Sequence, residues 1–99
     1  ENLITFSKIK DWEITELPNK KVILHLRKRV LYSSSIYVFE LPFEINNAAI
    51  LSSSEDIHNQ VIFTSTIDGN VIRVKRWPDV IAGGNNVVNI CIIANKIIV

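Results

Sequence analysis

Hydrophobic and polar residues alternate along much of this chain with a period of two, which is the pattern of half-buried β-strands. The clearest example covers residues 21–30. One face of this segment carries only aliphatic residues: Val22, Leu24 and Leu26. The opposite face is mixed: Ile23, His25 and Arg27. Strand-favouring residue types predict further strands over residues 3–9, 12–15 and 36–41.

Turns and irregular segments separate these strands. Residues 17–20, Leu-Pro-Asn-Lys, predict a turn, because proline fixes φ and asparagine tolerates tight backbone conformations. Asn46 and Asn47 form a polar stretch before residues 48–51, which are either a short strand or irregular. Residues 52–56, Ser-Ser-Ser-Glu-Asp, have the composition of a loop or of a capped helical turn.

Residues 61–77 predict a β-hairpin. Its centre, Asp68-Gly69-Asn70, supplies residue pairs that accept the positive φ angles of a two-residue turn. In that register one face belongs to the core: Val61, Phe63, Ser65, Ile67, Ile72 and Val74. The other face is solvated: Thr64, Thr66, Arg73 and Lys75. A three-residue loop would set Phe63 beside Lys75 and mix the two faces, so the two-residue turn is preferred.

The last predicted strand differs from the hairpin because both of its faces are apolar. It follows a break at Ala82-Gly83-Gly84 that permits a sharp reversal. One face carries Val88, Ile90, Ile92 and Ala94, and the other is dominated by Val87, Cys91 and Ile93. Such a strand needs cover on both sides, so it is either a central strand of the fold or part of an interface between chains.

The composition agrees with one all-β domain that spans residues 1–99. Isoleucine and valine contribute 27 residues and alanine only four, which favours strands because β-branched side chains pack well on a pleated sheet. The expected fold is a compact antiparallel β-barrel or β-sandwich. The chain has no methionine and begins with Glu1, so we expect it to be the C-terminal part of a longer protein.

Several classes of function are disfavoured by the composition. The net charge of +1 gives no bulk field to attract nucleic acid or anionic lipid, and we expect no membrane insertion because no apolar run approaches the ~20 residues of a span. The sequence contains no nucleophile motif, no phosphate-binding loop and no metal-ligand spacing, so we expect neither an enzyme nor a cofactor. The single cysteine, Cys91, excludes an internal disulfide and lies in an apolar segment typical of a buried residue.

Trp77 gives the strongest indication of a binding role. By parity it lies on the solvated side of its strand and is followed by Pro78 and Asp79. A flat aromatic ring can cover the C–H face of a sugar while polar neighbours bond its hydroxyls. The predicted saccharide site therefore comprises Trp77, Asp79 and Arg73, with His58 and Asp56 across a boundary between protomers. The alternative is a tryptophan packed under the loop that follows it.

Two short basic groups suggest a different ligand. These are residues 27–29, Arg-Lys-Arg, and the cluster of Arg73, Lys75 and Arg76 with Trp77. A basic strand beside an aromatic ring can hold single-stranded nucleic acid by phosphate attraction and base stacking. Solvated strand faces carry similar charges, which also discourage aggregation, and we prefer that interpretation for a chain of this net charge.

The succession of segments from Val22 to Ile93 resembles the C-terminal head or receptor-binding domains of bacteriophage tail fibres and baseplate proteins. The segments are the strand Lys21-Val22-Ile23-Leu24-His25-Leu26, then Leu41-Pro42, then the Asp68-Gly69-Asn70 hairpin, the Ala82-Gly83-Gly84 break and a closing strand. The resemblance implies a compact antiparallel β domain, a homotrimer at the end of a fibre, and binding of saccharides on the host surface.

We therefore expect a binding module of a viral tail fibre or similar adhesin, located on the virion or another extracellular surface. Its partners would be further copies of the chain, as a trimer, and a host saccharide. The first alternative is a structural β module that trimerises or docks and binds no ligand. The second is a small nucleic-acid-binding β-barrel.

Overall fold

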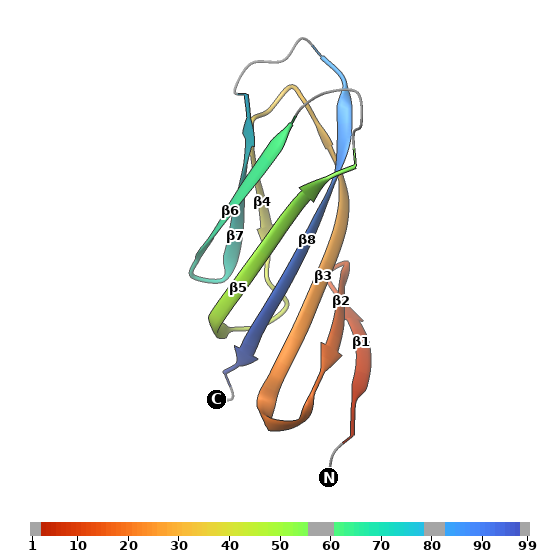
Figure 1. Ribbon diagram of the computed structural model, residues 1–99, viewed down its shortest axis with the longest axis vertical. Helices are drawn as coiled ribbons and strands as arrows, with labels where there is room; N and C mark the ends of the chain where they lie inside the picture. Colours follow the sequence, from red (N-terminus) through yellow and green to blue (C-terminus); the bar gives the residue numbers. More distant parts are fainter. Residues whose placement is uncertain (1–2, 56–60, 79–82, 98–99) are drawn as a thin grey trace.

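Eight strands and one short 3-10 helix make up the described residues, 3–55, 61–78 and 83–97, in a computed structural model of the chain (Figure 1). In chain order the elements are β1 (Thr5–Ile9), β2 (Trp12–Glu16), η1 (Pro18–Lys20), β3 (Lys21–Leu31), β4 (Ile36–Glu40), β5 (Ile45–Ser54), β6 (Ile62–Asp68), β7 (Val71–Trp77) and β8 (Asn85–Lys96). The all-β prediction is confirmed for these residues, and the predicted turn at residues 17–20 holds the 3-10 helix.

The strands form two antiparallel sheets with the orders β1-β2-β3-β8-β5 and β4-β7-β6. One hydrophobic core lies between the sheets, and its fully buried residues come from both: Trp12, Leu24, Ile72, Val74, Ile90 and Ile92. The described residues therefore form a sandwich of two sheets and not a closed barrel. The molecule is elongated, at 51 × 24 × 19 Å, because β3 and β8 are long strands that run along its length (Figure 1).

Strand β8 occupies an interior position in the larger sheet. It pairs with β3 from Asn95 opposite Lys21 to Asn85 opposite Leu31, and with β5 on its other edge. The residues of its inner face are buried in the core: Val88, Ile90, Ile92 and Ala94. The prediction of a central strand is therefore confirmed for the inner face of β8. Its outer face is only partly covered, since Cys91 is half-buried and Ile93 is 45% exposed.

The β6–β7 hairpin has the predicted two-residue turn. Asp68 pairs with Val71, and Gly69 adopts the positive φ of 63° that the first central position of such a turn demands. Phe63, Ile72 and Val74 are buried as predicted. A second two-residue turn, at Lys10 and Asp11 with φ of 51° and 69°, connects β1 to β2.

The prediction for the segment before Asp56 was wrong. Residues 52–54 belong to β5 and form neither a loop nor a helical turn, and β5 also includes the polar pair Asn46-Asn47. A register shift between Asn46 and Ala49, with Asn47 at a φ of 52°, lets the strand continue through this pair. The serines are accepted in a strand because β8 supplies their backbone partners, and Asn86 Nδ2 donates to Ser54 Oγ at 2.6 Å.

Candidate functional site

The outer face of the three-stranded sheet carries the candidate site. Cross-strand register aligns Ile36 of β4 with Lys75 of β7, and Lys75 with Thr64 of β6. In neighbouring rows Arg73 lies opposite Thr66, and Trp77 lies opposite Ile62. We refer to this surface as the Trp77 face, defined by Ile36, Ile62, Thr64, Thr66, Arg73, Lys75 and Trp77. The backbone register of two strand pairs fixes the positions of these side chains.

Trp77 is held in place by its two neighbours on this face. Its indole Nε1 donates a hydrogen bond of 3.0 Å to Thr64 Oγ1. The Lys75 ammonium lies 4.6 Å from the centroid of the indole ring, within range of a cation–π interaction. The Trp77 residue is nevertheless 45% exposed. A large aromatic surface is therefore presented to solvent in a fixed orientation, as a ligand that stacks on it requires.

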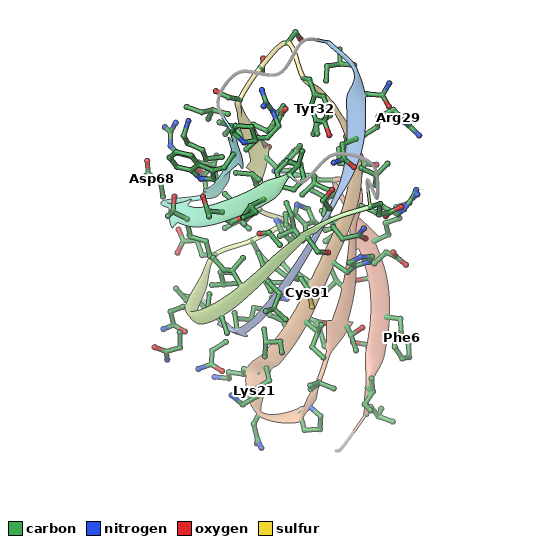
Figure 2. All side chains as sticks on the ribbon, turned by 45° about the horizontal axis from the view of Figure 1, so that its top comes forward. Phe6, Lys21, Arg29, Tyr32, Asp68 and Cys91 are labelled. Carbon is green, nitrogen blue, oxygen red and sulfur yellow. The ribbon has the colours of Figure 1, made fainter. Side chains whose placement is uncertain are left out.

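A shallow depression of about 300 Å³ lies beside Trp77 on the same sheet. Its lining residues are Ile36, Thr64, Thr66, Arg73, Val74 and Lys75. Two hydroxyls and two cationic groups thus surround apolar carbon atoms. Arg73 reaches Asp68 through Nε at 3.4 Å, but its side chain is 54% exposed, and Figure 2 places Asp68 at the hairpin tip. The depression has the donors needed for an oxygen-rich ligand and favours one that carries negative charge.

The structure places two of the five predicted site residues together. Trp77 and Arg73 lie on the same side of β7, with Lys75 between them. Asp79, His58 and Asp56 lie outside the described residues. Thr64, Thr66 and Lys75 were predicted to share the solvated face but were not assigned to the site. Ile36 could not be assigned from the sequence, because no local pattern predicts that β4 pairs with β7.

The sequence pattern grouped Arg76 with the exposed basic residues Arg73 and Lys75, but Arg76 is buried. It is 1% exposed and lies opposite Phe63 on the core side of β7. Its guanidinium donates to the backbone carbonyls of Pro78, Tyr32 and Ser34, and it lies 5.0 Å from the Tyr32 ring. Strand parity accounts for this, since residue 76 has the even parity of the buried Ile72 and Val74.

The two basic groups lie on different surfaces of the sandwich. Arg27 belongs to the outer face of the five-stranded sheet and forms a bidentate ion pair with Glu55, at 2.8 and 2.9 Å. Lys28 pairs with Asp11 at 2.9 Å. Arg73 and Lys75 lie on the outer face of the other sheet. Within the described part of the chain the two groups therefore do not combine into one basic strip along which a nucleic acid could run.

A polar cluster around His25 lies on the outer face of the five-stranded sheet. His25 Nδ1 lies 3.3 Å from Glu13 Oε1, its Nε2 lies 3.0 Å from Asn89 Oδ1, and Cys91 is its cross-strand neighbour. Both ring nitrogens already have partners. Across residues 3–55, 61–78 and 83–97 no group of three or more His, Cys, Asp or Glu side chains is arranged to hold a metal ion.

Comparisons of the chain with protein-family models, with curated proteins and with solved structures found no match. In the described segments no helix has the length and apolar character that a membrane span needs. The functional assignment therefore depends on the geometry of the Trp77 face and on the sequence pattern.

Proposed function

We propose that this chain is a receptor-binding module that binds a host-surface saccharide at the Trp77 face. The observation that carries the proposal is the half-exposed Trp77, fixed by Thr64 and Lys75 beside a depression lined by hydroxyls and cations. The C–H face of a sugar ring stacks on the exposed indole surface, and Thr64 and Thr66 bond its hydroxyls.

The two cationic side chains of the Trp77 face favour an acidic saccharide as the ligand. Arg73 and Lys75 both line the depression, and a charge-assisted hydrogen bond to a carboxylate or phosphate is roughly twice as strong as a neutral one. An acidic sugar thus gains more from this surface than a neutral sugar of the same shape. Binding of an acidic sugar weakens with added salt, because exposed charges are screened over about 8 Å at physiological ionic strength.

The same proposal places the module in a homotrimer at the end of a viral tail fibre or similar adhesin, on the virion or another extracellular surface. The support is the order of segments in the sequence, together with a two-sheet β domain whose outer faces expose large hydrophobic residues such as Phe6, Leu51 and Trp77. The chain acts as a binding protein, without catalysis, cofactor or insertion into a membrane.

A glycan array tests the saccharide site directly. The wild-type protein should bind a restricted set of acidic glycans, and Trp77→Ala should lose about fivefold to tenfold in affinity, because stacking on an aromatic ring contributes about 1 kcal/mol. Leu31→Ala is the matched control, since Leu31 is 60% exposed on the other sheet and lies outside the Trp77 face. Glycan binding that is unchanged in Trp77→Ala would contradict this site. Arg73→Gln should weaken the binding of acidic glycans more than that of neutral glycans.

A structural module that binds no ligand is the alternative that a specific observation favours. The outer face of the five-stranded sheet exposes Phe6, Leu51 and Ile93, which suits contact with protein better than contact with sugar. An assembled protein that binds no glycan would support this alternative. The nucleic-acid alternative requires oligonucleotide binding with a steep salt dependence, and the separation of the two basic groups argues against it.

A further inference from the structure

Apolar side chains occupy much of two neighbouring rows on the outer face of the five-stranded sheet. Cross-strand pairing aligns one row over all five strands: Phe6, Thr15, Ile23, Ile93 and Ala49. The next row in the same register comprises Lys8, Glu13, His25, Cys91 and Leu51. We call the apolar members of these rows the outer band: Phe6, Ile23, Ala49, Leu51, Cys91 and Ile93.

Three of the four large residues of the outer band are exposed in the single chain, and Ile23 is half-buried. Phe6 is 78%, Leu51 68% and Ile93 45% exposed. Figure 2 shows Phe6 projecting from β1 at the edge of the sheet and Cys91 near the middle of the long strands. Scattered surface leucines are normal, but the members of the outer band on β3, β8 and β5 are neighbours in two adjoining rows and form a contiguous patch, which in a folded protein marks a site of association.

Charged residues of both signs surround the outer band. Lys8 and Glu13 are cross-strand neighbours, and Glu13 Oε1 lies 3.3 Å from His25 Nδ1. Arg27 pairs with Glu55, where hydrogen bonds from Arg27 and then Asn89 hold the pKa of Glu55 below its usual range. The pair is therefore ionised at neutral pH. The face has charges of both signs, so a second copy of the same face is not repelled.

The Trp77 face carries two cations, Arg73 and Lys75, on one strand, and Arg73 Nε pairs with Asp68 Oδ2 at 3.4 Å. Both outer faces of the sandwich therefore carry charges of both signs, and the faces differ in size. The five-stranded sheet offers the larger face for a second copy, whereas the Trp77 face, with two cations beside a small depression, suits a small anionic ligand.

The size of the sheet is sufficient for a specific interface. Two outward-facing rows cross all five strands, about 24 Å at ~4.8 Å spacing, and two more rows cross only β3, β8 and β5, about 14 Å, with each row covering ~6.6 Å of strand length. Each copy thus offers ~500 Å², and two copies together bury ~1,000 Å², which is the size that a specific protein–protein interface should reach. Sheets that pack face to face lie about 10 Å apart, a distance that side chains of the outer band can fill.

We infer that the outer band is the surface through which copies of this chain assemble. The inference rests on the homo-oligomeric part of the proposed function and is independent of saccharide binding. It also accounts for the composition of β8, whose inner face packs in the core of one copy while Cys91 and Ile93 face another copy. Both faces of the doubly apolar strand are then covered.

Sedimentation velocity of the intact protein over a wide concentration range tests the inference. The wild type should sediment as a concentration-dependent oligomer. Ile93→Lys should weaken self-association at least tenfold, because it buries an unpaired charge near the middle of the band. Val38→Lys is the matched control, since Val38 is 50% exposed on the opposite sheet and its substitution should leave the mass unchanged. Circular dichroism of each variant verifies that its strands are intact.

The reactivity of Cys91 supplies a second measurement. Alkylation of its thiol by iodoacetamide should slow as the wild-type concentration rises, but not in Ile93→Lys. A monomeric wild type at every concentration, or an Ile93→Lys variant that assembles as well as wild type, would overturn the inference. A sedimenting mass of two copies would support the outer band as the interface and contradict the proposed trimer. Loss of glycan binding in Trp77→Ala with assembly intact would show that the two surfaces are separate.

Discussion

Arg76 stands directly opposite Phe63 in the β6–β7 ladder, and both side chains point into the sandwich. An arginine buried beside a phenylalanine is uncommon, because a buried cation loses its hydration. Here the guanidinium is bonded to the carbonyls of Tyr32, Ser34 and Pro78. These carbonyls belong to the β3–β4 connection and to the end of β7, so Arg76 ties together two segments at one end of the molecule.

Replacing Arg76 with methionine should destabilise the protein by about 3 kcal/mol. Methionine fills similar space but leaves backbone acceptors without a donor, at a cost of about 1–3 kcal/mol for each buried group. Arg73→Met on the exposed side of the same strand should change the free energy of unfolding by no more than ~0.5 kcal/mol. Urea unfolding of both variants gives the comparison. Equal effects in the two would mean that Arg76 contributes no more than a surface charge.

Local patterns predicted most of the sheet faces correctly. The alternation at Val22, Leu24 and Leu26 and the turn at Gly69 depend only on neighbouring residues, and both are confirmed. Phe63 was placed on the core side by the same reasoning. The same alternation, extended by one cross-strand pair, predicts that the Arg76 side chain is buried. Its positive charge had instead suggested that it belongs to an exposed basic cluster. Residue type was a poorer guide than register at this position.

The remaining features depend on contacts that are distant in sequence. Residues 52–54 are polar and resemble a loop, yet they form strand because β8, more than 30 residues later, pairs with them. Ile36 joins the candidate site only because β4 pairs with β7. The sequence also could not show that the outer face of β8 stays open, since this depends on the order of strands in the sheet.

The two tryptophans should be distinguishable by fluorescence. Trp12 is fully buried and its Nε1 donates a hydrogen bond of 2.7 Å to the Glu40 carbonyl, whereas Trp77 is 45% exposed. Trp77→Phe should therefore leave blue-shifted emission that acrylamide quenches weakly. Trp12→Phe should leave red-shifted, readily quenched emission and cost about 2 kcal/mol, since the Glu40 carbonyl loses its donor. Similar quenching in the two variants would contradict the assigned environments.

Substituting alanine at Gly69 and at Gly84 should distinguish the stability cost of backbone strain from the added cost of steric crowding. Gly69 has a φ of 63° and open space around the position of a Cβ atom, whereas Gly84 has a φ of 106° and a Cβ there would lie 3.3 Å from Tyr32 Cδ2. We expect Gly69→Ala to cost about 1 kcal/mol and Gly84→Ala about 2 kcal/mol or more, because the second φ lies outside the left-handed helical region. Thermal unfolding measures both. The reverse order would show that the Gly84 region relaxes easily.

The Glu16–Lys96 ion pair should make stability depend on pH in the acid range. Lys96 Nζ donates to Glu16 Oε1 at 2.7 Å, and this hydrogen bond holds the pKa of Glu16 below its ordinary value. The unfolded chain then binds a proton at higher pH than the folded chain does, so the pair stabilises the fold above about pH 4.3, the unfolded value, and this contribution is lost as pH falls through the lower folded pKa.

Glu16→Gln tests this linkage. The substitution should lower the free energy of unfolding by about 0.5 kcal/mol at pH 7, a typical value for a partly exposed pair, and the difference from wild type should shrink as the pH falls below about 4. The exposed Glu44 provides the control, and Glu44→Gln should not reproduce this loss at pH 7. A difference between Glu16→Gln and wild type that stays constant from neutral to acid pH would mean that packing, and not ionisation, explains the effect of this residue.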